Sequence, residues 1–146
     1  MKISAQGIAL IKSFEGCRLE AYPDPATGGE PFTVGVGHTG PEVHEGMTIT
    51  EEQADAYLAS DLERFERCVS EALTAEITQA QFDACVSLAF NIGCGNFNKS
   101  SVCRYLNAGE PAKAQEAFAL WNKAEGKVMA GLTRRRAAEA ELFGTA

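Results

Sequence analysis

The sequence contains no run of about 20 apolar residues, the length that crosses a bilayer as a helix. Its N-terminus also has no apolar stretch of about seven residues before a small-residue cleavage site, the pattern of a secretory signal. We therefore expect neither membrane insertion nor signal-dependent export. Apolar residues make up 45% and charged residues 23% of the 146 residues, which predicts one soluble globular domain.

Basic residues are few. Lys and Arg number 13 against 20 Asp and Glu, which gives a net charge of −7. Binding to a phosphate backbone requires clustered Lys and Arg, so we expect no nucleic-acid partner. The one dense basic cluster is 134–136. Because Glu139 and Glu141 follow it, we interpret it as a helix surface that contributes one buried ion pair.

Metal-binding and disulfide patterns are also missing. His38 and His44 are the only histidines, and none of the five cysteines forms a Cys-x-x-Cys pair. We expect no metal and no cofactor, a hydrogen-bonding role for His38, and reduced thiols that mostly behave as small buried residues. A cysteine peptidase or amidase using Cys17 and His38 is an alternative, but no third orienting residue is evident. The other cysteines are Cys68, Cys85, Cys94 and Cys103.

Helical periodicity dominates the chain. Ser4 is a candidate N-cap, Gly16 a helix end, and the stretches 50–53 and 78–81 are capping boxes. The helix that follows Thr50 has about 20 residues and is therefore about 30 Å long, enough to join two lobes beside a cleft. Predicted helices cover residues 4–14, 50–71, 78–92, 100–106, 111–121 and 132–143.

One stretch concentrates groups suited to acid–base chemistry. Glu15 falls in the last turn of the first helix, where the partial negative charge of the helix end should raise the pKa of its carboxyl. Asp24 lies between two prolines in a turn-rich segment, 23–31, that connects two strands.

A strand with a bare face follows this turn. Residues 32–38 alternate, so Thr33, Gly35 and Gly37 are predicted to share one face. Glycines in a strand often mark the close approach of a ligand or another backbone. We predict that substrate binds against this face. The alternative for each glycine is a bulge or a bend in the strand.

Several motifs resemble a known family. Phe-Glu-Gly-x-Arg-Leu-x-x-Tyr, an Asp in a turn and Phe-Thr-Val-Gly-Val-Gly-His resemble the start of phage-type lysozymes, glycoside hydrolase family 24. Further along, residues 89–97, 105–109 and 131–139 resemble the lambdoid-phage branch. The resemblance implies an α+β, lysozyme-like fold in one domain, 1–146. Its expected parts are a small β lobe at about 16–50, a connecting helix at about 50–71 and a helical lobe made of 1–15 and 72–146.

The resemblance also implies an activity. It is the hydrolysis of the β-1,4 bond between N-acetylmuramic acid and N-acetylglucosamine in peptidoglycan, with host cell lysis as its outcome. The family's catalytic Glu, Asp and Thr correspond to Glu15, Asp24 and Thr33. By the same resemblance, Phe90 and Ser100 are expected to bind substrate. The resemblance also implies that the protein is a monomer and accumulates in the host cytoplasm. A holin-type membrane lesion is expected to release it to the cell wall.

The sequence leaves open the identity of the second carboxylate, the arginine partner of Glu15 and the choice among three functions. The turn between Asp24 and Thr33 is longer than in the shortest family members, so Glu20 and Glu30 compete as the second carboxylate. One arginine of 134–136 is expected, by resemblance, to pair with Glu15. A lytic transglycosylase acting on the same bond and an inactive wall-binding homologue are the rival functions.

Overall fold

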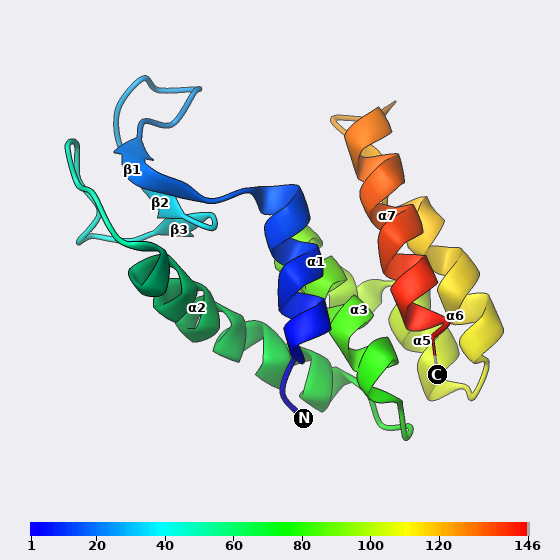
Figure 1. Cartoon of the computed structure of the whole chain (residues 1–146). Coiled ribbons are helices and arrows are strands. Elements are labelled where there is room, and N and C mark those ends of the chain that lie inside the picture. The colour runs from blue at the N-terminus through cyan, green and yellow to red at the C-terminus, as the bar shows by residue number, and fades with distance from the viewer. Residues whose placement is uncertain (146) are drawn as a thin grey trace. The chain divides into compact units, whose positions relative to one another are not determined.

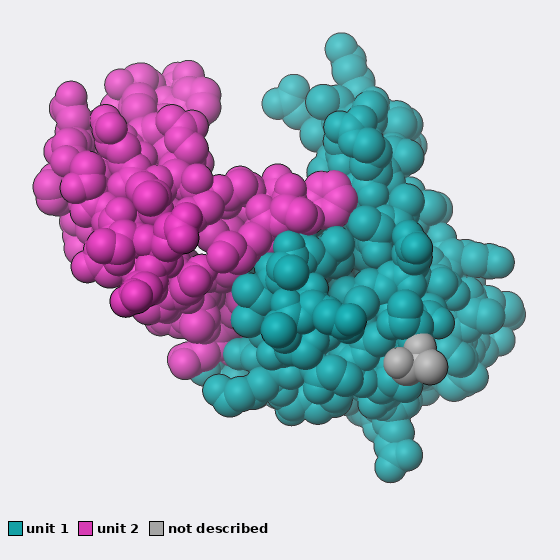
Figure 2. Space-filling view, viewed as in Figure 1, with its two compact units in different colours: residues 1–11, 64–146 teal, residues 12–63 magenta. Residues whose placement is uncertain are grey.

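The computed structural model describes residues 1–145 and contains two compact units (Figure 2). Unit 1 consists of residues 1–11 and 64–146, and unit 2 of residues 12–63. The division falls within two helices, α1 (Ala5–Glu15) and α2 (Glu51–Ala72), so each of these helices contributes residues to both units.

Helices and short antiparallel sheets together confirm the predicted α+β class (Figure 1). The remaining helices are α3 (Gln79–Ile92), α4 (Cys94–Lys99), α5 (Ser101–Asn107), α6 (Pro111–Ala117), the 3₁₀ helix η1 (Phe118–Leu120) and α7 (Ala130–Phe143). The strands are β1 (Arg18–Tyr22), β2 (Thr33–Gly35), β3 (His38–Thr39), β4 (Lys123–Ala124) and β5 (Lys127–Val128).

Unit 2 packs a small antiparallel sheet, in the order β1-β2-β3, against its part of α2. Its core consists of four buried side chains: Val34, Val43, Ile49 and Ala54. The predicted capping box at the start of α2 is present, because the backbone N–H of Gln53 donates to Thr50 Oγ1 at 3.1 Å and the backbone N–H of Thr50 donates to Gln53 Oε1 at 2.9 Å.

The predicted continuous strand at 32–38 is wrong. The chain makes a hairpin here, with a turn at Val36 and Gly37 between β2 and β3. Gly35 and Gly37 have φ values of +65° and +68°, a left-handed conformation that favours glycine. This conformation breaks the strand alternation, so Val34, Gly35 and Val36 are all buried in succession. Gly35 therefore lies against the core rather than on a bare face, and the alternative of a bend is the one observed.

Unit 1 is built around α3, the central helix that the sequence predicted. Most of its residues are buried, and it packs against α7, while α5 and α6 pack together. Its capping box is also confirmed, with Thr78 as the N-cap and Gln81 as the reciprocal partner. Ser4 occupies the predicted N-cap position directly before α1, where its carbonyl accepts from Ile8 N–H at 3.0 Å, and its hydroxyl donates to Asp83, a buried residue of α3.

Two local elements differ from the prediction. Gly93 ends α3 as expected, but α4 begins at Cys94 in spite of Gly95, where we predicted no helix. Past α6, a β4–β5 hairpin turns at Glu125 and Gly126, which both have positive φ. Positive φ at both central residues is the geometry of a type I′ turn. Glutamate is rarely found there, so the residue pattern does not predict this hairpin.

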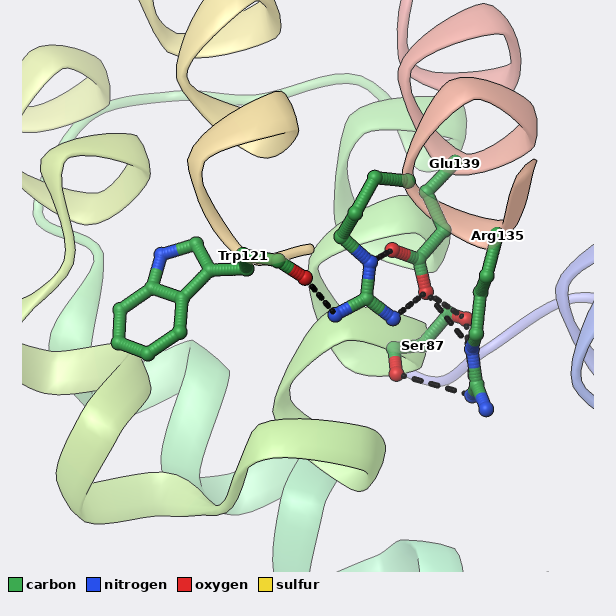
Figure 3. Close-up of polar contacts among 5 residues, drawn as sticks. Ser87, Trp121, Arg135 and Glu139 are labelled. Atoms are coloured by element: carbon green, nitrogen blue, oxygen red, sulfur yellow. Dashed lines mark hydrogen bonds and ion pairs between the residues drawn. The ribbon is translucent and has the colours of Figure 1, made fainter. Parts of the chain in front are cut away.

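The prediction that residues 134–136 form a helix surface is partly wrong, because two of the three arginines belong to a buried charge cluster on α7 (Figure 3). Arg134 and Glu141 are exposed, but Arg135, Arg136 and Glu139 are buried, with Glu139 0% exposed.

One carboxylate holds this cluster together. Glu139 Oε1 lies 2.7 Å from Arg136 Nε, and Oε2 accepts hydrogen bonds from Arg135 Nε at 3.2 Å and from Ser87 Oγ of α3 at 2.5 Å. Burial raises the pKa of the Glu139 carboxyl, and the two arginines and Ser87 oppose that rise. The cluster connects α7 to α3 through charge-assisted hydrogen bonds.

Within residues 1–145, no helix combines the length and the apolar character that a bilayer crossing requires.

We expect Glu139→Ala to lower the free energy of unfolding by about 3–5 kcal/mol, because it leaves two buried guanidinium groups without their shared carboxylate. Arg134→Ala, at an exposed position of the same helix, should change it by less than about 0.5 kcal/mol. Urea unfolding followed by circular dichroism measures both variants. A loss below about 1 kcal/mol for Glu139→Ala would contradict a structural role for the cluster.

Candidate active site

Glu15 is the last residue of α1, as the sequence predicted. Gly16, with φ +73°, ends the helix, and its backbone N–H donates to the Lys12 carbonyl at 2.9 Å. Lys12 also holds this end of the helix to α2, because its Nζ lies 2.8 Å from Asp55 Oδ1. The Glu15 side chain is therefore carried by a fixed helix end and lies at an exposed position.

The Glu15 carboxylate lies beside the hairpin turn of unit 2. A methyl group built on Gly37 would be 4.0 Å from Glu15 Oε1. Gly37 is exposed, so its missing side chain leaves space next to the carboxylate. Of the two glycines predicted to face substrate, Gly37 is exposed and Gly35 is buried, and contact of Gly37 with substrate stays a prediction.

Thr33 occupies the first position of β2, in the middle of the three-stranded sheet. Its neighbours in register are Tyr22 on β1 and Thr39 on β3. The side chain of Thr33 is half-buried. The sheet therefore fixes the backbone of Thr33 from both sides.

Asp24 begins a tightly bonded loop two residues after β1. Its backbone N–H donates to the Gly29 carbonyl at 3.0 Å, and its carbonyl accepts from Gly28 N–H at 2.7 Å. Its side-chain Oδ1 accepts from the backbone N–H of Ala26 at 2.7 Å, which is an Asx turn. Within the described residues, Oδ2 accepts no hydrogen bond. The loop thus orients the carboxylate through one oxygen and leaves the other for solvent or substrate.

The competing carboxylates lie on different elements of the same unit. Glu20 is on β1 and pairs through its backbone with Thr48. Glu30 is exposed and lines a surface hollow with Phe32 and Thr39. Neither side chain takes part in a hydrogen bond among the described residues, so neither is oriented in the way that Asp24 is.

The two predicted substrate-binding residues belong to unit 1, whereas the three predicted catalytic residues belong to unit 2. Phe90, near the end of α3, is half-buried and makes an edge-to-face contact with Phe65 at a ring distance of 5.2 Å. Ser100 is 2% exposed and caps α5, since its Oγ accepts from Cys103 N–H at 3.1 Å. Saccharide binding by Phe90 and Ser100 stays a prediction, as does the pairing of an arginine of 134–136 with Glu15.

His38 has the hydrogen-bonding role that the sequence favoured, with partners that the sequence could not identify. Its ring lies between two carboxylates, with Nδ1 2.8 Å from Asp61 Oδ2 and Nε2 2.5 Å from Glu42 Oε1, and stacks on Tyr57 at 4.1 Å. Burial lowers the pKa of His38, but the hydrogen bonds and charges of Glu42 and Asp61 outweigh it and raise that pKa overall.

The residues of 1–145 contain no group of three or more His, Cys, Asp or Glu side chains arranged to hold a metal ion. Glu15, Asp24 and Thr33 all belong to unit 2, and two carboxylates and a hydroxyl are groups that suit acid–base chemistry.

Residues 12–139 match the family model described as phage lysozyme. The endolysin of Salmonella phage P22 is 44% identical over 147 residues, and the match covers 98% of both chains. The endolysin of Bacillus phage B103 is 46% identical over 145 residues; the match covers 99% of this chain but 55% of that protein. The chain thus spans about half the length of the Bacillus phage relative.

Among solved structures, the muramidase domain of SpmX from Asticaccaulis excentricus superposes with a TM-score of 0.90 at 42% identity, and the match covers 99% of both chains. This match confirms the lysozyme-like fold that the resemblance implied.

We expect stability to depend on pH through His38. Because the folded state raises the pKa of His38 above its ordinary 6.5, its contribution to stability is full below about pH 6.5 and is lost as the pH rises through the raised value. Asp61→Asn should lower the pKa of His38 in an NMR titration of the imidazole and weaken this pH dependence in urea unfolding. Unchanged titration in Asp61→Asn would show that Asp61 does not contribute to the shift.

Proposed function

Because the chain belongs to the phage lysozyme family, we propose that it is a muramidase that hydrolyses the β-1,4 bond between N-acetylmuramic acid and N-acetylglucosamine in peptidoglycan, which causes lysis of the host cell. One observation carries the proposal beyond family membership. The Glu15 carboxylate stands at the exposed end of α1 and faces a side-chain-free position at Gly37. A carboxyl group so placed is accessible to a polymer.

Glu15 acts as the general acid. Cleavage of a glycosidic bond requires a protonated group that gives its proton to the leaving oxygen as the bond breaks. Glu15 is the last residue of α1 and lies at an exposed position, where a leaving oxygen of the glycan can reach it. Gly16 ends the helix directly after Glu15, and the Lys12–Asp55 ion pair joins this end of α1 to α2.

Asp24 and Thr33 position the attacking water and stabilise the positive charge of the oxocarbenium-like transition state. We assign this role to Asp24 over Glu30 because the Asx turn orients the Asp24 carboxylate and leaves Oδ2 without a protein donor among the described residues. The family resemblance favours inversion at the anomeric carbon. Inversion requires room for a water, and hence a separation of about 6.5–9.5 Å between the carboxyl groups of Glu15 and Asp24.

The glycan is proposed to contact Phe90, whose ring is half-buried and offers an apolar edge. Ser100 contributes through the cap that fixes the start of α5, since its hydroxyl already bonds within the chain. A monomeric state, release by a holin and action at the cell wall after a period in the host cytoplasm follow from the family resemblance. The charge of −7 supports the absence of a nucleic-acid partner.

We expect Glu15→Gln to reduce lysis of outer-membrane-permeabilised cells by at least about 100-fold, because glutamine cannot supply the proton. A turbidity assay measures the rate, and thermal unfolding should show a nearly unchanged melting temperature. Glu45→Gln, at another exposed glutamate of unit 2, is the matched control and should retain wild-type activity. Near-normal lysis by Glu15→Gln would remove Glu15 from the mechanism.

The products of the same digestion separate the rival reactions. Mass spectrometry should find reducing muramic acid ends, because water attacks the glycosyl carbon. Anhydro-muramic ends would indicate a lytic transglycosylase, and intact glycan with bound protein would indicate an inactive wall-binding homologue.

We expect Asp24→Ala to lower the turnover rate by about 100-fold, whereas Glu30→Ala should stay within about twofold of wild type. Both carboxylates belong to the loop between β1 and β2, so the pair controls for changes in loop charge. Turnover on purified peptidoglycan measures the effect. The reverse order of the two variants would make Glu30 the second carboxylate.

A further inference from the structure

Two thiols in unit 1 lie where two surface hollows meet. A cavity of about 510 Å³ and a neighbouring one of about 450 Å³ are lined by shared residues, Cys68, Glu71 and Cys94. Cys68 is on α2 and Cys94 is the first residue of α4. Both side chains are partly exposed, so small molecules in solvent can reach them. This corrects the expectation that most of the cysteines are buried.

The two thiols are also close to each other. Both side chains line both hollows, which makes them neighbours on the surface that the hollows share. Burial, together with the neighbouring Cys94 thiol, raises the pKa of Cys68 to about 12. The pair therefore combines mutual proximity with access from solvent.

The other cysteines lack this combination. Cys103 lines the larger cavity but is 5% exposed, and its Sγ lies 3.7 Å from the Ala72 carbonyl and 3.8 Å from Asn107 Nδ2. Cys85 is 0% exposed. Cys17 is exposed but belongs to unit 2.

We propose that Cys68 and Cys94 form an oxidative modification site that reacts with a small-molecule disulfide and closes into a Cys68–Cys94 disulfide joining α2 to α4. The site is independent of the proposed hydrolysis, whose catalytic residues belong to unit 2. Its product constrains the unfolded chain between the two cysteines and so stabilises the fold.

The reaction proceeds in two exchanges. The Cys94 thiolate attacks one sulfur of the reagent RSSR, which forms a mixed disulfide on Cys94 and releases RS⁻. Cys68 stays protonated at neutral pH because of its raised pKa, so it acts second. It gives its proton to a base, attacks the Cys94 sulfur and releases another RS⁻. Two protein thiols are oxidised and one RSSR is reduced to two RSH, so atoms and electrons balance.

The experiment treats the full chain with oxidised glutathione and counts alkylatable thiols after denaturation. We expect the count to fall from five by at least two in wild type, since the exposed Cys17 also forms a mixed disulfide with glutathione. Combined digestion with trypsin and Glu-C then places Cys68 on fragment 68–71, Cys85 and Cys94 together on 77–99, and Cys103 on 100–104, so the Cys94→Ser variant is needed to distinguish Cys94 from Cys85. Mass spectrometry without reduction should find 68–71 linked to 77–99, and reduction should separate them.

Variants assign the link. Cys68→Ser and Cys94→Ser should each abolish it, whereas Cys103→Ser and Cys17→Ser should preserve it. The oxidised wild type should melt roughly 5–10 °C above the reduced protein, a difference that Cys94→Ser lacks. Five free thiols after oxidation, a link that involves Cys103 or Cys85, or a melting temperature that does not rise would each overturn the proposal.

Discussion

The left-handed backbone at Gly35 and Gly37 is the constraint on which the candidate active site depends. It turns β2 back into β3 within a few residues, so that Val34 and Val36 are both buried while Gly37 stays exposed. Any other residue at either glycine position would have to adopt a positive φ, which costs about 1 kcal/mol or more for most residues. The same turn places an empty position beside the carboxylate of Glu15. Hairpin geometry and the proposed chemistry thus have one cause.

The starts and ends of helices could be predicted from the sequence, because residues close in sequence determine them. The capping boxes at Thr50 and Thr78 each satisfy two backbone donors with side chains three residues apart, so the helix starts could be read without tertiary information. Glycine at position 16 likewise marked the end of α1, and with it the placement of Glu15 on the final residue of that helix. The motif of the opening stretch predicted the family from the same residues.

Features that depend on partners distant in sequence could not be predicted. The alternation at 32–38 indicated one strand, because positive φ is not visible in a pattern of apolar residues. The three-arginine stretch looked like a helix surface, since nothing local reveals that Ser87 lies 52 positions before Glu139 and bonds to it. In the same way, neither Glu42 nor Asp61 was recognised as a partner of His38. The first error concerns a backbone conformation at two glycines, and the other two concern polar groups that bond to residues of another segment.

The buried charge of Glu139 and the proposed catalytic carboxylates follow opposite physical rules. Glu139 is fully buried and therefore needs two arginines and a hydroxyl, because an unpaired buried charge costs several kcal/mol. Its role is structural, and it keeps α7 on α3 in unit 1. In unit 2, Glu15 lies at an exposed helix end, and an Asx turn orients the half-buried Asp24 carboxylate through one oxygen. A carboxylate oriented in this way keeps an accessible oxygen, and access is what a group that must exchange a proton or a water with a polymer requires.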